Sequence, residues 1–417
     1  MTMKHRVWLE INLGTLVANY RRIAAHVKPA KVLCVLKANA YGLGVAEYAR
    51  ALAGAGCRNF GVAEPYEAME LKELFAGGRG RPPLPVGRDQ PAGRDVLGAP
   101  PEIQILSSIL PDEIPAMVKA GVTLPVIDFA TAKLISAAAV KAKTTARVHF
   151  KLDTGMGRLG ILATGEGGVE RAVETMLAAK ALPGIVCEGV FSHFPVAFDP
   201  KDPFTRGQIS LFRRILAAAE KKGLSFRNVH LAASDGINNF PECARPPFTM
   251  VRTGINLHGS FDPNGRRALK VEPVLSLKTR VAQVRELPAG TTLGYGRTWC
   301  LNAPTRIATI SAGYADGLPL ALANRGSVFV GGRRCKIVGR ISMDYTTVDV
   351  SGVPDVKPGD EVVCFGACGS DAITPDDWAA LKGTHAYDVI CSLGSRVQRV
   401  VEAPRKARGT KDGGDVR

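Results

Sequence analysis

A lysine stands between an apolar run and a glycine-rich turn in Val35-Leu36-Lys37-Ala38-Asn39-Ala40-Tyr41-Gly42-Leu43-Gly44. The apolar run Val32–Leu36 is typical of a strand buried on both faces of a parallel sheet, and Val45–Leu52 has a helical pattern. Lys37 is therefore expected at the C-terminal end of a strand, which faces the ligand in α/β folds. Such a lysine suits Schiff-base chemistry where apolar surroundings lower its pKa, although the position equally suits a lysine that points into solvent. The choice depends on which other residues converge on Lys37.

Short apolar runs alternate with helical or connecting segments up to residue 253, after a helix for which Asn12 is the expected N-cap. The eight runs are Val32–Leu36, Phe60–Ala63, Ile103–Leu106, Thr123–Val126, Ala146–Leu152, Ile185–Phe191, Asn228–Ala232 and Met250–Thr253. This order predicts an α/β fold, a (β/α)₈ TIM barrel, with a doubly wound sheet as the alternative. The barrel is favoured because Gly42-Leu43-Gly44 lacks the third glycine of a dinucleotide-binding G-x-G-x-x-G motif.

The pattern changes after the eighth run. We expect the barrel over 12–255 and a C-terminal mostly-β domain over 256–403, where strand-like segments are separated by Gly, Pro and Asn turns. The N-terminal strand 5–11 is expected to join this second domain. Residues 76–101 are rich in Gly, Pro and Arg and predict an exposed insertion, and 404–417 predict a disordered tail.

Composition excludes several classes of function. The net charge of +16 would suit a nucleic-acid partner, but the Lys and Arg residues are spread along the chain, so none is expected. No apolar run approaches the roughly 18 residues of a membrane span, and the first residues lack the apolar core of a signal peptide, so we expect a cytoplasmic protein with no membrane contact. The nine cysteines fit reduced core thiols, and the pair Cys364 and Cys368 has the wrong spacing for a zinc knuckle, so no metal is expected.

The ends of the predicted barrel strands hold polar side chains. Lys37, the segment Lys151–Arg158, His193, Ser234 and Arg252 all fall there. Each has an ordinary structural explanation, such as a core histidine, a helix cap or a surface charge, but catalytic groups of barrels gather at this face.

An anion would explain part of this set, because Ser234 and the backbone N–H groups of Gly254 and Ile255 could point at one phosphate. A lysine, a phosphate site and an arginine together suggest pyridoxal 5'-phosphate, with Lys37 as the Schiff-base lysine. Arg252 beside the pyridine nitrogen would keep that nitrogen unprotonated, which favours simple proton movement over transamination.

Six motifs then resemble those of alanine racemase, a fold-type III pyridoxal-phosphate enzyme family with a (β/α)₈ barrel and a C-terminal β domain. The resemblance covers nearly all of 5–403 outside the insertion. The motifs are Val35–Gly44, Lys151-Leu152-Asp153-Thr154-Gly155-Met156-Gly157-Arg158-Leu159-Gly160, Arg252-Thr253-Gly254-Ile255, Gly294-Tyr295-Gly296, Gly313-Tyr314-Ala315-Asp316-Gly317 and Gly339-Arg340-Ile341-Ser342-Met343-Asp344.

The resemblance implies a two-base mechanism in a homodimer. Lys37 would act on one face of the substrate Cα, and Tyr295, donated across the interface by the other subunit together with Met343, would act on the opposite face. Inversion needs two opposed groups, because a single base returns its proton to the face that it came from. A basic tyrosine needs cationic or hydrogen-bonding neighbours, and the family match suggests His193 for this role, with His230 orienting Arg252.

The resemblance also implies how cofactor and substrate are held. Tyr41, Ser234, Gly254, Ile255 and Tyr387 would bind the phosphate. Arg158 would lie beside the cofactor oxygen and the substrate carboxylate, which the Met343 backbone would also meet. Lys151 resembles a lysine that many members carry as a carbamate holding Arg158. Tyr314 would line the access channel with Arg340, and Asp344 is expected to be a supporting residue of the site, as are His230 and Arg340.

Three positions depart from the family pattern. Ala233 stands where Asn is common before the phosphate serine, His258 where Tyr is common, and Leu320 where Arg is frequent. None removes a catalytic group. The expected function is interconversion of L- and D-alanine, which would supply D-alanine for peptidoglycan. The alternatives are a broad-specificity or serine-preferring amino-acid racemase on the same scaffold, and a non-catalytic pyridoxal-phosphate carrier.

Overall fold

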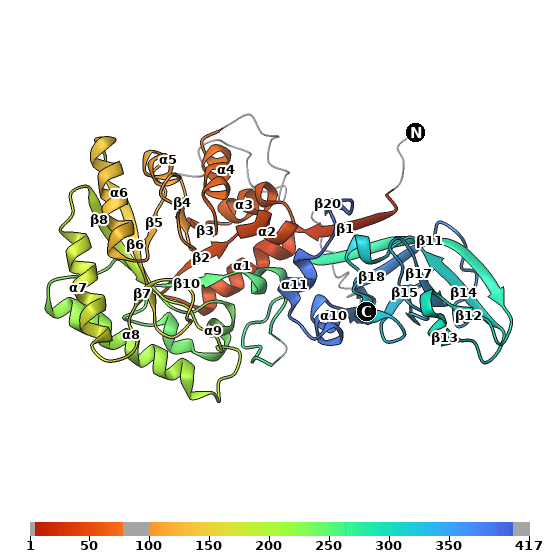
Figure 1. Ribbon diagram of the computed structural model, residues 1–417. Helices are drawn as coiled ribbons and strands as arrows, with labels where there is room; N and C mark the ends of the chain where they lie inside the picture. The colour runs from red at the N-terminus through yellow and green to blue at the C-terminus, as the bar shows by residue number, and fades with distance from the viewer. Residues whose placement is uncertain (1–4, 78–99, 263, 403–417) are drawn as a thin grey trace, which may run out of the picture.

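The computed structural model describes residues 5–77, 100–262 and 264–402 of the 417-residue chain. It contains a barrel of parallel strands wrapped by helices and a second body of mainly antiparallel strands beside it (Figure 1). The expected insertion at 76–101 and tail at 404–417 lie almost wholly outside the described residues.

Eight parallel strands form the barrel. They are β2 (Lys31–Val35), β3 (Asn59–Val62), β4 (Glu102–Ile105), β5 (Leu124–Val126), β6 (Ala146–Asp153), β8 (Ile185–Phe191), β9 (Asn228–His230) and β10 (Met250–Thr253). Hydrogen-bonded neighbours follow the order β4-β3-β2-β10-β9-β8-β6-β5. A parallel bridge between Gln104 and Thr123 joins the two ends. The predicted (β/α)₈ barrel is therefore confirmed, with each strand within two residues of its expected bounds.

Helices cover the outside of the barrel, as the alternation of patterns predicted. They are α1 (Leu13–His26), α3 (Val45–Gly54), α4 (Pro65–Phe75), α5 (Ile114–Lys119), α6 (Phe129–Lys141), α7 (Gly168–Lys180), α8 (Pro203–Lys221) and the short α9 (Ser234–Asn239). Asn12 is the N-cap of α1, since its side chain accepts a hydrogen bond of 2.9 Å from the Thr15 N–H. A two-residue strand, β7 (Ile161–Leu162), extends the edge of β6.

The second sheet is built around β11 (Leu275–Leu287), whose length lets it pair with several strands. Its order is β16-β15-β18-β11-β1-β20, with β14, β17 and β19 attached at the sides. These strands are β1 (Val7–Asn12), β14 (Thr305–Ile310), β15 (Ser327–Val330), β16 (Arg333–Lys336), β17 (Thr346–Asp349), β18 (Glu361–Cys368), β19 (Asp371–Ile373) and β20 (Gln398–Glu402). The chain thus begins and ends its described part in neighbouring strands, because β1 pairs with β20 in parallel.

Smaller elements of the second domain carry residues that matter below. A ribbon of β12 (Thr292–Leu293) and β13 (Trp299–Cys300) flanks a 3₁₀ turn, η3 (Tyr295–Arg297), at the end of the domain far from the barrel (Figure 1). Two helices, α10 (Pro375–Lys382) and α11 (Ala386–Cys391), lie between the sheet and the barrel (Figure 1).

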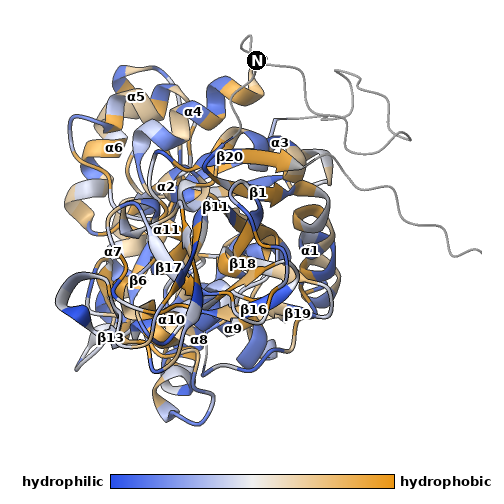
Figure 2. Cartoon of the chain, turned by 90° about the vertical axis from the view of Figure 1, so that its right-hand side faces the viewer, coloured by the Kyte–Doolittle hydropathy of each residue, from blue (hydrophilic) through white to orange (hydrophobic). Residues whose placement is uncertain are grey.

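The two bodies share one continuous apolar core, which includes Leu9 of β1, Leu33 of β2 and Phe365 of β18. A view onto the second domain shows hydrophobic residues on its central strands, such as β18 (Figure 2). Across the described ranges, every helix is too short or too polar to cross a bilayer.

Candidate active site

Lys37 opens a short turn that winds the left-handed way. The segment Lys37–Gly42 is α2, but Ala38, Asn39, Ala40 and Tyr41 all have positive φ values between 52° and 61°. L-residues avoid this region because Cβ crowds the following carbonyl, at a cost of about 1–2 kcal/mol each. The expected loop after the strand is therefore a strained turn that the surroundings must stabilise.

This turn borders a cavity of about 590 Å³ at the C-terminal ends of the barrel strands, a size typical of small-molecule sites. Apolar side chains such as Val35, Leu106 and Phe191 make up much of its lining. The predicted site residues that line it are Lys37, Tyr41, Lys151, Arg158, His193, Ser234, Arg252, Gly254 and Tyr387. Residues from five different barrel strands or their ends thus converge as the sequence predicted.

Hydrogen-bond donors crowd one end of the cavity. The Gly254 N–H donates to Ser234 Oγ at 3.2 Å, and the hydroxyl of Tyr387 is hydrogen-bonded to Ser234 and to the Ile255 backbone. A Cβ at position 254 would lie 2.3 Å from the Tyr41 hydroxyl, so only glycine fits there. Five donors therefore meet at one place, and we call these five residues (Tyr41, Ser234, Gly254, Ile255 and Tyr387) the anion cradle.

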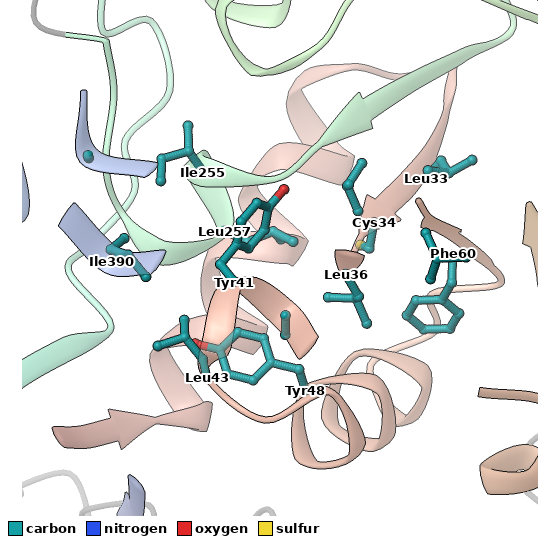
Figure 3. Packing of buried hydrophobic residues seen from close by; sticks show 14 of the residues in the cluster. Leu33, Cys34, Leu36, Tyr41, Leu43, Tyr48, Phe60, Ile255, Leu257 and Ile390 are labelled. Atoms are coloured by element: carbon teal, nitrogen blue, oxygen red, sulfur yellow. The ribbon is translucent and has the colours of Figure 1, made fainter. Parts of the chain in front are cut away.

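The two tyrosines of the anion cradle stay protonated. Burial is the main cause that raises the pKa of Tyr41 well above its usual value and that of Tyr387 to about 12. Their rings lie 5.5 Å apart, and Tyr41 is packed among Ile255, Leu257 and Ile390 (Figure 3). Both hydroxyls can therefore donate to an anion at neutral pH.

Arg252 is a buried residue of the cavity lining and is held by two histidines. Its guanidinium donates to Nδ1 of His230 at 3.0 Å and to Nδ1 of His193 at 3.2 Å, and also to the carbonyl oxygens of Ser192 and Leu231. Burial lowers its pKa to about 10, so it remains a cation near neutral pH.

The same histidines are neutral. Desolvation, followed by the charge of Arg252, lowers the pKa of His193 to about 3 and that of His230 well below its usual value. Since Arg252 donates to each Nδ1, each ring carries its proton on Nε2. The Nε2–H of His230 donates a hydrogen bond to Nδ1 of His149 at 3.1 Å. The expected role of His230 in orienting Arg252 agrees with these contacts.

Lys151 lies buried beside other cations. Its Nζ donates to the Leu106 carbonyl at 2.7 Å and stands 5.6 Å from the centre of the Phe191 ring. Desolvation first, then the charges of Arg158, Arg252 and Lys37, lower its pKa to about 8. A substantial share of the amine is therefore neutral and nucleophilic near neutral pH.

The structure does not bring the remaining predicted residues into this cavity. Tyr295 is 73% exposed and Met343 52% exposed, and Tyr314 also points outward. Arg340 lies against Gly294, beside Tyr295, since a Cβ on Gly294 would meet the Arg340 backbone N at 2.7 Å. Exposed large side chains on one domain leave room for a partner to cover them.

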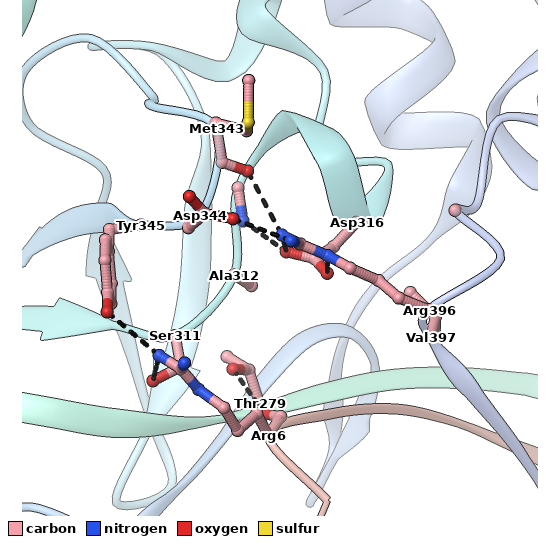
Figure 4. Close-up of polar contacts among 12 residues, drawn as sticks. Arg6, Thr279, Ser311, Ala312, Asp316, Met343, Asp344, Tyr345, Arg396 and Val397 are labelled. Carbon is pink, nitrogen blue, oxygen red and sulfur yellow. Dashed lines mark hydrogen bonds and ion pairs between the residues drawn. The ribbon is translucent and has the colours of Figure 1, made fainter.

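Arg396 joins the two loops that carry Tyr314 and Met343. It makes a two-pronged ion pair with the buried Asp316 at 2.7 and 2.9 Å and contacts Asp344 at 2.7 Å and the Met343 carbonyl (Figure 4). Asp344 thus supports the Met343 loop, although away from the cavity of its own chain.

Sequence reasoning missed three residues that shape the site. Phe191 stacks on His230 with ring centres 4.9 Å apart and contacts both Lys151 and Arg252. Glu67 and Arg399 bind the backbone of the Lys37 turn. Of the three, only Glu67 could have been noticed in the sequence, because a glutamate at the third position of a helix is typical of a capping box. That pattern does not reveal its contact with the Ala38 N–H.

The fold and the cavity define a class of protein, namely a (β/α)₈ barrel with a lysine and a cluster of anion-binding donors at the C-terminal ends of its strands. Comparison with known proteins narrows this class. Residues 11–262 match the family model "Alanine racemase, N-terminal domain", and residues 274–401 match "Alanine racemase, C-terminal domain". The chain belongs to the alanine racemase family, whose members are pyridoxal-phosphate-dependent isomerases.

Individual relatives agree over nearly the whole length. The alanine racemase of Desulforamulus reducens is 36% identical, with 95% of this chain and 99% of the relative covered. The structure of alanine racemase from D-cycloserine-producing Streptomyces lavendulae has a TM-score of 0.83 at 32% identity, covering 96% and 98% of the two chains. That of Bartonella henselae, with covalently bound pyridoxal phosphate, has a TM-score of 0.79 at 28% identity, covering 96% and 100%.

The residues of this chain fit that cofactor. The anion cradle offers hydrogen-bond donors for a phosphate, and Arg252 and Lys37 line the same cavity. When bound, pyridoxal phosphate supplies an electron sink that makes the substrate Cα proton acidic.

Proposed function

We propose that the protein interconverts L- and D-alanine by two-base proton transfer, with Lys37 acting on one face of the substrate and Tyr295 of a second copy on the other. The single observation that carries this proposal is that Lys37, the anion cradle and the buried Arg252 line one cavity. The names of its relatives support the substrate.

Tyr295 is assigned to a second copy because of where it lies. Among the described residues, both tyrosines that line the cavity, Tyr41 and Tyr387, belong to the anion cradle and have raised pKa values. Neither suits proton transfer at Cα. Tyr295 is exposed on the far end of the second domain, where a C2 partner could receive it.

His193 would then serve Tyr295 as a hydrogen-bond donor. Its ring is neutral, with Nδ1 bonded to Arg252, so its Nε2–H can donate to a phenolate oxygen. Because the ring is neutral, His193 would lower the pKa of Tyr295 by donating a hydrogen bond and not by a positive charge. Arg158 lines the cavity and would meet the substrate carboxylate, with Met343 of the second copy nearby.

We infer that this reaction supplies D-alanine for peptidoglycan in the cytoplasm. Rates on alanine, serine, lysine and arginine measured side by side test the substrate, and alanine is expected to be the best. A higher kcat/KM for serine would transfer the proposal to a serine-preferring racemase.

The roles are tested with Lys37→Ala and Tyr295→Phe. Lys37→Ala should lose the visible absorbance of the lysine-bound cofactor and racemisation together. Tyr295→Phe should keep the absorbance and lose racemisation. Tyr66→Phe, on an exposed residue of α4, is the matched control and should behave as wild type.

Mixing the two inactive variants tests donation across the interface. A hybrid dimer has one site with both changes and one with neither, so random exchange should restore about a quarter of wild-type activity. No recovery after verified subunit exchange would show that Tyr295 acts within its own chain, and an active Lys37→Ala protein would end the proposal.

A further inference from the structure

The strained turn Ala38–Tyr41 is contacted at its beginning by a buried carboxylate. Glu67, on α4, is 4% exposed. Its Oε1 accepts a hydrogen bond of 2.5 Å from the Ala38 N–H, and its Oε2 accepts from the N–H groups of Ala63 and Glu64 at 2.8 and 3.1 Å. One carboxylate therefore ties the residue after Lys37 to the end of β3 and the start of α4.

A half-buried guanidinium contacts the other end of the turn. Arg399, on β20, donates from Nε to the Gly42 carbonyl at 3.0 Å. Its two NH₂ groups donate to the carbonyls of Leu393, Gly394 and Val397 at 2.6–3.0 Å. These bonds fix the orientation of the planar guanidinium group. Arg399 thus connects the turn of the barrel to the last strand of the second sheet.

The signs of the two charges suit the backbone that they meet. A helix of either hand has N–H groups without an intrahelical partner at its start and carbonyl groups without one at its end. Glu67 satisfies the first and Arg399 the last. Four consecutive positive φ values persist in a segment without glycine only where the surroundings over-determine them.

We propose that Glu67 and Arg399 form a two-ended clamp that holds the left-handed turn, and thereby positions Lys37 and Tyr41 for the cofactor. Both are positioning residues, since neither lines the cavity. The role in positioning Lys37 rests on the proposed function, whereas the clamp on the turn can be measured without any cofactor.

Glu67→Gln is the sharpest change for the first end. Glutamine keeps the size but has one oxygen, so when that oxygen faces Ala63 and Glu64 its NH₂ group faces the Ala38 N–H. The defect should therefore fall on the turn, while α4 keeps its cap. Arg399→Lys is the corresponding change at the other end, because a lysine cannot bond four carbonyls in a fixed fork.

Hydrogen–deuterium exchange of the cofactor-free protein measures the clamp. Peptides covering residues 37–44 should exchange at least about tenfold faster in each variant, with peptides from β9 unchanged. Because the clamp should need both ends, losing one end should already release the turn. The exchange rate of the double variant should therefore be little higher than that of the faster-exchanging single variant, so the two effects are strongly non-additive. Glu70→Gln on the exposed face of α4 and Arg214→Lys on α8 are the matched controls.

A second measurement reports the position of Lys37. With pyridoxal phosphate added, Glu67→Gln should show altered circular dichroism in the absorbance band of the lysine-bound cofactor, and kcat should fall by about tenfold to a hundredfold with a smaller change in KM. A merely structural role would lower thermal stability without changing that band.

The outcomes separate the two proposals. Turn exchange equal to that of the controls in both variants would overturn the clamp, whatever the activity. If the turn exchanges faster in the variants but the wild-type protein does not bind pyridoxal phosphate, the clamp is supported and the proposed function is refuted. If Glu67→Gln does not fold, Arg399→Lys decides, since an unchanged turn there would refute the two-ended clamp.

Discussion

Lys151 is expected to react with carbon dioxide. A lysine with its ordinary pKa of 10.5 is about 0.3% neutral at pH 8, whereas a lysine with a pKa of about 8, as Lys151 has, is about half neutral. The nucleophilic amine is therefore more abundant by over a hundredfold. In the reaction the Nζ lone pair forms a bond to the carbon of CO₂, and the electron pair of one C–O π bond moves onto its oxygen to give the carbamate anion. The nitrogen then loses a proton to solvent.

The surroundings of Lys151 favour the product. The ammonium is next to the positive charges of Arg158, Arg252 and Lys37, so burial and repulsion both disfavour it. A carbamate reverses the sign at the same place and can accept hydrogen bonds from Arg158. Charge-assisted bonds of this kind are roughly twice as strong as neutral ones, so we expect Arg158 to be ordered by the modification.

Carbon-13 NMR of protein equilibrated with labelled bicarbonate at pH 8 tests this. One carbamate signal should appear in the wild type, disappear in Lys151→Gln, and persist in Lys141→Gln, which changes an exposed lysine. Removing CO₂ should lower wild-type activity several-fold and leave Lys151→Gln unchanged. A wild-type protein without a signal that depends on Lys151 would refute the reasoning from its pKa and neighbours.

Two further predictions follow from the geometry. Gly313→Ala should lower the melting temperature and racemase activity, because its Cβ would lie 2.3 Å from the Ser342 carbonyl oxygen, while Gly352→Ala, with nothing within 4 Å, should do neither. Asp235→Asn should tighten binding of pyridoxal phosphate at pH 8 but not at pH 5, measured by absorbance titration. Burial, then Asp262, raise the pKa of Asp235 to about 6, so a carboxylate beside the anion cradle repels phosphate only above that pH, and equal affinities at pH 8 would contradict this.

The barrel could be predicted from sequence because its signals are local. Each strand is a short apolar run, and runs of this kind leave few other folds once the connections are helical. The convergence of Lys37, His193, Ser234 and Arg252 followed from that frame alone, since C-terminal strand ends share one face.

The left-handed turn could not be predicted in the same way. Ala-Asn-Ala-Tyr carries no glycine at any of its four positive φ values, so nothing local signals the conformation. Its determinants are distant in sequence: Glu67 lies 29 residues from Ala38, and Arg399 lies 357 residues from Gly42. Such long-range backbone contacts are fixed by the packing of α4 and β20, which only the folded chain shows.

The charge states of the site also needed the structure, and they change how its chemistry is understood. His193, His230 and His258 are all kept neutral by burial, with pKa values below their usual range. A change in activity between pH 6 and 8 therefore cannot come from these rings gaining a proton. Since Tyr41 and Tyr387 stay protonated as well, these two tyrosines and the histidines around Arg252 keep one charge state over this range. A pH profile should accordingly report on the groups that move protons, together with Asp235 and Lys151, whose pKa values of about 6 and about 8 lie at the two ends of this range.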